Sequence, residues 1–69
     1  MLQEYLQSKR MALPKYTVLT TQGEAHAQLF QVECEIEQLK LSARGVGVSR
    51  RSAEQVAAEA AYRQIEVRQ

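Results

Sequence analysis

The 69-residue sequence has a single cysteine, a single proline and no tryptophan, and its nine basic residues are almost balanced by eight acidic ones. One thiol cannot form an internal disulfide and fits a reducing interior, so we expect a cytoplasmic protein in which Cys34 is a small buried apolar group. No apolar run approaches membrane-spanning length, and no membrane partner is expected. With a net charge of +1, attraction to a polyanion must come from the placement of charges.

The sequence also has few residues that could carry catalysis. The pair Gly45-x-Gly47 lacks the lysine and the spacing of a phosphate-gripping loop. One histidine and one cysteine cannot make a structural metal site, and the alternating acids Glu33, Glu35 and Glu37 do not converge on a point. We therefore expect residues 1–69 to form one small non-enzymatic domain, with no cofactor, bound metal or small-molecule substrate.

Hydrophobic periodicity and turn residues predict an α+β order of helix, three strands and helix. The expected helices cover residues 2–10 and about 50–67, and the expected strands cover residues 15–21, 29–39 and 41–44. Pro14 is expected to end the first helical region, and Gly45 and Gly47 to release the chain from the sheet. A tight connection is expected at residues 38–40.

The middle strand predicts which face of the sheet is unsuited to a polyanion. Apolar residues alternate there with Gln31, Glu33, Glu35 and Glu37, as in a half-buried strand with an acidic outer face. RNA-binding sheets that stack bases use exposed aromatic side chains in basic surroundings. Like charge would repel a polyanion here, so nucleic acid would have to bind through helix ends and loops.

The start of the last helix carries two arginines and no acid, although a helix N-terminus favours negative charge. A phosphate could accept from the exposed N–H groups and pair with Arg50 and Arg51; two solvated surface arginines are the alternative. Ser49 is the expected N-cap, with Ser52 and Gln55 forming a competing capping box. Either cap keeps both arginines at the helix entrance.

Three segments resemble a known family. They are Leu-Gln-Glu-Tyr-Leu-Gln at 2–7, Gly-Glu-Ala-His at 23–26 before Phe-Gln-Val-Glu-Cys, and Gly-x-Gly-x-Ser-Arg-Arg-x-Ala-Glu-Gln-x-Ala-Ala-x-x-Ala at 45–61. Together they resemble the double-stranded RNA-binding domain, and most of all the C-terminal domain of bacterial ribonuclease III. The resemblance covers roughly residues 2–66 and implies a three-stranded antiparallel sheet with two helices packed on one face.

The resemblance implies that Gln3, Glu4 and Gln7 of the first helix meet an RNA minor groove. Their spacing puts them on a polar side opposite Leu2 and Leu6. Amide and carboxylate groups suit ribose 2′-hydroxyls, which both donate and accept, and such contacts favour RNA over DNA. Without the resemblance, these residues would be interpreted as a solvated helix surface.

His26, in the loop between the first two strands, matches a position that enters the next minor groove. Imidazole is flat and can donate or accept a hydrogen bond, although a lone loop histidine is more often simply exposed. Many relatives have proline after the loop glycine, where this chain has Glu24. That difference predicts a less rigid loop and an unfavourable charge near RNA.

By the same resemblance, Ser49, Arg50 and Arg51 bridge the narrow major groove by binding phosphates on its two sides, without reading bases. A third basic residue is usual in this motif, but positions 52 and 54 are Ser and Glu, so weaker binding is expected. Three further cations could supplement the patch, but their faces are not predictable from sequence. They are Lys40, Arg44 and Arg63.

The resemblance implies a module that binds double-stranded RNA by shape, over about 16 base pairs, and anchors substrate for an endonuclease domain that this chain lacks. The implied parent is ribonuclease III, a magnesium-dependent enzyme that is a homodimer through that other domain. The alternative is a protein-interaction or dimerisation module of the same fold without RNA binding.

Overall fold

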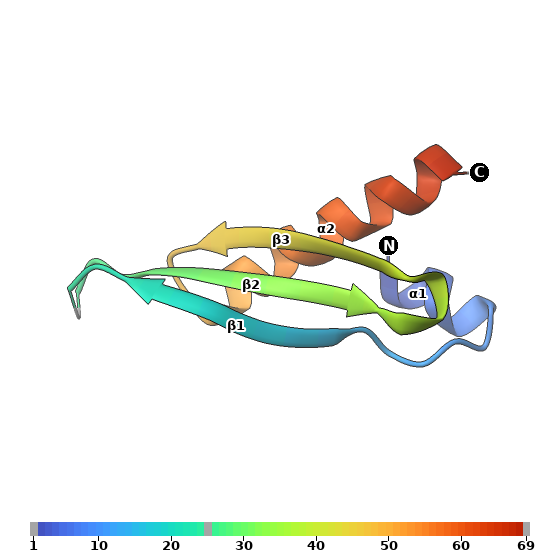
Figure 1. Cartoon of the computed structure of the whole chain (residues 1–69), viewed down its shortest axis with the longest axis horizontal. Coiled ribbons are helices and arrows are strands. Elements are labelled where there is room, and N and C mark those ends of the chain that lie inside the picture. Colours follow the sequence, from blue (N-terminus) through green and yellow to red (C-terminus); the bar gives the residue numbers. More distant parts are fainter. Residues whose placement is uncertain (1, 25, 69) are drawn as a thin grey trace.

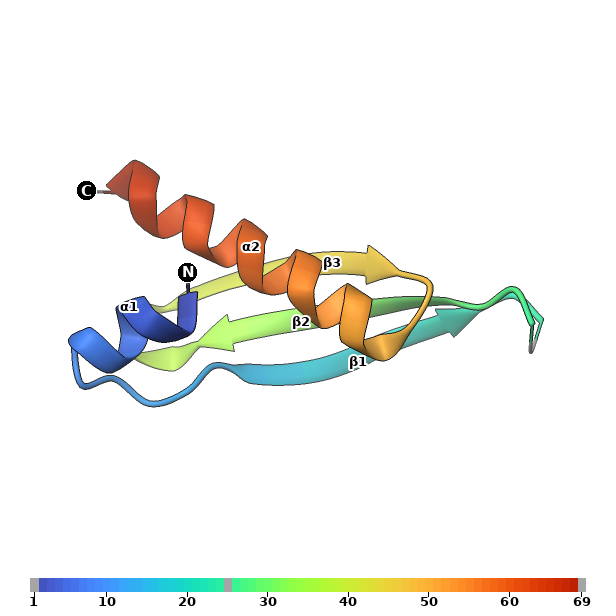
Figure 2. The same ribbon diagram turned by 180° about the vertical axis from the view of Figure 1, so that it is seen from behind.

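The computed structural model describes residues 2–24 and 26–68, without the Arg68 side chain, and has the predicted α-β-β-β-α order. The elements are α1 (Leu2–Ser8), β1 (Lys15–Gln22), β2 (Leu29–Ile36), the 3₁₀ turn η1 (Glu37–Leu39), β3 (Leu41–Gly47) and α2 (Arg50–Arg68). The strands form one antiparallel sheet in the order β1-β2-β3. Both helices lie on the same face of the sheet, as Figures 1 and 2 show from its two sides.

The core lies between this face and α2. Alternate residues of β2 are buried, among them Val32 and Cys34, as the sequence pattern predicts. On α2, four residues spaced by four are all buried: Ala53, Ala57, Ala61 and Ile65. Short alanine side chains let the helix axis approach the sheet closely.

The close approach explains why the prediction for Gly45 and Gly47 was wrong. Both glycines belong to β3, where they pair with Val32 and Phe30 of β2, and the chain leaves the sheet only after Gly47. A Cβ atom on Gly45 would collide with the backbone of Ala53 and Ala57. Glycine is therefore needed at position 45 because α2 crosses directly over it.

Two element ends also differ from the prediction. Helix α1 ends at Ser8, because Arg10 takes a left-handed φ of 57° and the N–H of Met11 donates to the Leu6 carbonyl at 2.9 Å. This is a Schellman-type cap, so Pro14 does not end the helix. Strand β2 ends at Ile36, and η1 makes the tight connection that Lys40 completes with a φ of 50°.

Burial raises the pKa of the Tyr16 phenol to about 12, with a further contribution from the neighbouring Cys34 thiol. Burial also raises the pKa of Cys34. Both groups are therefore neutral over the ordinary pH range. Within residues 2–24 and 26–68, no helix combines the length and apolar content needed to cross a membrane.

Candidate functional site

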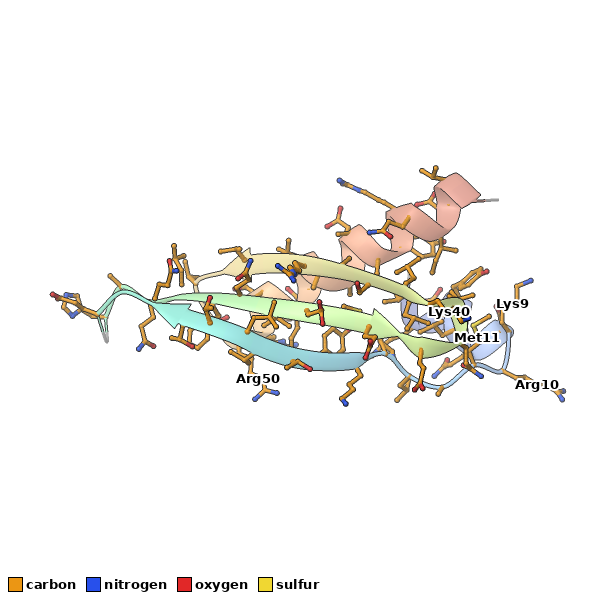
Figure 3. All side chains as sticks on the ribbon, viewed as in Figure 1. Lys9, Arg10, Met11, Lys40 and Arg50 are labelled. Atoms are coloured by element: carbon orange, nitrogen blue, oxygen red, sulfur yellow. The ribbon has the colours of Figure 1, made fainter. Side chains whose placement is uncertain are left out.

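The three segments singled out in the sequence lie in series along the molecule, whose longest dimension is 40 Å. Figure 2 shows α1 at one end, the β1–β2 turn at the other, and the start of α2 between them. In Figure 3 the Arg50 side chain extends past the β1 edge of the sheet, whereas Lys9, Arg10, Met11 and Lys40 gather at the α1 end.

Helix α1 is amphipathic in the predicted sense. Leu2 and Leu6 are buried, while Gln3, Glu4 and Gln7 are all exposed. Leu2 and Leu6 pack into the same core as α2, and this packing fixes the orientation of α1. Three hydrogen-bonding side chains are thereby presented to solvent from a short, anchored helix.

The β1–β2 turn extends beyond the last paired residues, Gln22 and Leu29. Gly23 has a φ of 95°, and a Cβ atom there would collide with the Ala27 backbone. His26 is exposed, and its Nε2 lies 3.8 Å from a carboxylate oxygen of Glu24. Because both side chains are 84% exposed, this pair is weak and leaves the imidazole accessible to a ligand.

The start of α2 is held by a reciprocal cap between two serines. The N–H of Ser52 donates to the Ser49 hydroxyl at 3.1 Å, and the N–H of Ser49 donates to the Ser52 hydroxyl at 3.1 Å. Ser49 is therefore the N-cap, and Ser52 takes the place that Glu or Gln has in the usual capping box. The competing box of Ser52 with Gln55 does not form, since α2 already begins at Arg50.

The two arginines at this helix start differ in their partners. Arg50 Nε donates to a Glu54 carboxylate oxygen at 3.0 Å, one turn along α2. Arg51 is exposed, and its side chain makes neither a hydrogen bond nor an ion pair with any residue of the described ranges. The first turn of α2 contains no acidic residue, so its N–H groups and Arg51 together favour an anion.

A groove of about 660 Å³ runs between α1 and α2 and connects two of the three segments. Gln3 lines it from α1 and Arg51 from α2, while His26 is outside it. Tyr16, Tyr62 and Gln55 also line the groove, and none of these was a predicted site residue. The spacing of Gln55 from Arg51, four residues on a helix, is the sequence signal that could have indicated it.

The structure also places the three cations left open by the sequence. Arg44 lies on the outer face of the sheet and pairs with Glu33 at 3.6 Å, on the side away from both helices. Arg63 pairs with Glu59 at 2.7 Å on α2, and Lys40 follows η1 near α1. Arg44 therefore cannot join the arginines at the start of α2. No group of three or more potential metal ligands occurs in the part of the chain that the structure describes.

Comparison with known proteins gives one family. Its model, the double-stranded RNA binding motif, matches residues 1–65. Three similar curated proteins are each named Ribonuclease 3. One from Nitrosomonas europaea is 58% identical over 62 residues, which are 90% of this chain and 25% of that protein. One from Actinobacillus succinogenes is 55% identical over 67 residues, or 97% of this chain and 30% of that protein. One from Delftia acidovorans is 59% identical over 59 residues, which are 86% of this chain and 26% of that protein.

Proposed function

Because the chain belongs to the double-stranded RNA binding motif family, we propose that it binds double-stranded RNA by shape. In this proposal, Gln3, Glu4 and Gln7 of α1 contact ribose hydroxyls in one minor groove, and His26 enters the next. Arg50 and Arg51, at the cap formed by Ser49, bind phosphates across the major groove between them.

The serial arrangement of the three segments supports this binding mode. The start of α2 lies between α1 and the β1–β2 turn. This order matches a duplex, which presents a minor groove, a major groove and a second minor groove to the motif. Gln3 and Arg51 line one groove, so a single duplex could reach both. The carboxylates of Glu33 and Glu35 lie on the strand that forms the middle of the sheet, where they disfavour a polyanion on its outer face.

We further propose that this domain anchors substrate for a ribonuclease III catalytic domain. The chain spans only 25% to 30% of the length of the three Ribonuclease 3 relatives described above. RNA hydrolysis, magnesium binding and homodimer formation are then functions of the remaining part of such an enzyme. The residues of this chain contribute binding and not catalysis.

The test is a titration with an RNA duplex of about 20 base pairs, the matching DNA duplex and a single strand. We expect a preference for the RNA duplex that weakens as salt increases, because phosphate contacts release counterions. Failure to bind any of the three at low salt would reject RNA binding and favour a protein-interaction or dimerisation module. Sedimentation of the same sample would detect the dimer.

A further inference from the structure

Part of the lining of the groove between α1 and α2 has no role in the contacts proposed for a fully paired duplex. Besides Gln3 and Arg51, which those contacts use, Tyr16, Tyr62 and Gln55 line the groove. Its volume of about 660 Å³ is in the range of pockets that hold small organic ligands. The outside of a duplex presents phosphates and ribose hydroxyls. Aromatic side chains are not required to bind these groups.

We propose that this groove takes an unpaired nucleobase that projects from the bound RNA. The inference rests on the proposed function, since the base must belong to a duplex held by Gln3 and Arg51, which both line the groove. Aromatic side chains stack on bases, and amide side chains hydrogen-bond their exposed edges, which is how proteins recognise unpaired RNA.

The charges along the groove favour an uncharged occupant. Glu54 and Glu59 line the α2 side, and each carboxylate already accepts from an arginine of the same helix. These carboxylates would repel a phosphate that entered the groove, yet they can accept from the amino group of a base. Arg51 is the one cationic side chain among the lining residues and can hold the phosphate of the same nucleotide outside.

A bulged nucleotide is the suitable form of this ligand. A paired base would have to be unstacked and unpaired before it could enter, whereas an unpaired base has already lost most of that stabilisation. The domain otherwise recognises RNA by shape. With this groove, it would prefer duplexes that have an unpaired nucleotide at one position. That position is fixed by the distance between the contacts of α1 and of α2.

The experiment compares a perfect RNA duplex with duplexes that carry one unpaired adenosine, moved stepwise along one strand. We expect at least one position to bind about five- to tenfold more tightly than the perfect duplex, as one stacked base can supply. At that position a fluorescent adenine analogue should lose emission on binding, because it stacks. Gln55→Ala should reduce the gain while leaving affinity for the perfect duplex nearly unchanged.

Gln64→Ala is the matched control, because Gln64 is an exposed amide of α2 outside the groove that donates to the Ser42 carbonyl. Ala58→Met, which fills the groove, gives a second and independent block. Equal affinity for bulged and perfect duplexes at every position would overturn the groove proposal and leave double-stranded RNA binding intact. Absence of binding to all duplexes would overturn both.

Discussion

A carboxylate oxygen of Glu54 lies 3.0 Å from Nε of Arg50, in the place where we propose that a phosphate binds. The two residues are one turn apart on α2, and Glu54 is the more buried of the two, with its side chain 29% exposed against 62%. A phosphate that binds Arg50 must therefore share it with Glu54 or displace it. This competition is a structural reason to expect weaker phosphate binding at Arg50.

Removing that carboxylate should strengthen RNA binding. For Glu54→Gln we expect an affinity about two- to fivefold higher, which corresponds to the modest free energy of an exposed ion pair, and a steeper dependence on salt. Glu66→Gln is the control, because it removes the same charge from an exposed position of α2 outside the groove. Weaker binding by Glu54→Gln, measured by titration at two salt concentrations, would contradict this competition.

Arg51 should contribute to the salt dependence directly, since no described residue pairs with it. For Arg51→Ala we expect a similar loss of affinity for all duplex sequences, and a slope of log K against log salt that is smaller by about one unit. The control is Arg63→Ala, which removes an arginine from a later turn of α2. An unchanged slope would exclude a phosphate contact at Arg51.

Gln3→Ala should affect the choice between RNA and DNA more than the salt dependence. The exposed amide is proposed to contact a ribose hydroxyl, which DNA lacks, and it carries no charge. We expect the ratio of RNA to DNA affinity to fall about fivefold or more, as loss of one hydrogen bond of about 1 kcal/mol implies. Equal loss on both duplexes would reject the minor-groove contact.

Gly45→Ala should strongly destabilise the fold, because the added methyl meets backbone atoms of Ala53 and Ala57 that cannot move separately. We expect a loss of about 3 kcal/mol, which lowers Tm by about 12 °C or more in a domain of this size. Val46→Thr, an exposed position next to it, should change stability by less than about 0.5 kcal/mol. A Gly45→Ala variant as stable as the parent in thermal unfolding would show that α2 does not lie this close to β3.

Tyr16 should lower the free energy of unfolding at high pH. The charged form of tyrosine is the deprotonated one, and burial raises the folded pKa from 10.0 to about 12. The unfolded chain therefore loses this proton first, and the stabilisation is complete below pH 10 and disappears as pH rises toward 12. The measurement is the free energy of unfolding in urea, as a function of pH, for the parent and for Tyr16→Phe. The difference between the two proteins isolates the contribution of Tyr16 from that of other groups. If this difference is the same at about pH 9 as at about pH 12, the prediction is refuted.

The sequence determined the elements and much of the core, because both depend on local spacing. Alternation along residues 29–36 identified the buried side of β2, and spacing by four identified the buried alanines of α2. The same local rules put Gln3, Glu4 and Gln7 on the exposed side of α1. The family resemblance that the sequence motifs carry is confirmed by the family model.

The tertiary structure decided everything that depends on residues distant in sequence or on a choice between local partners. Gly45 was expected to end a strand, but the crossing of α2 makes it a contact point within β3. Arg44 pairs with Glu33 on the outer face of the sheet. The residue type at position 44 does not by itself reveal this pair. The groove that joins Gln3 to Arg51 exists only because α1 and α2 pack side by side, and no helical or strand period encodes that distance.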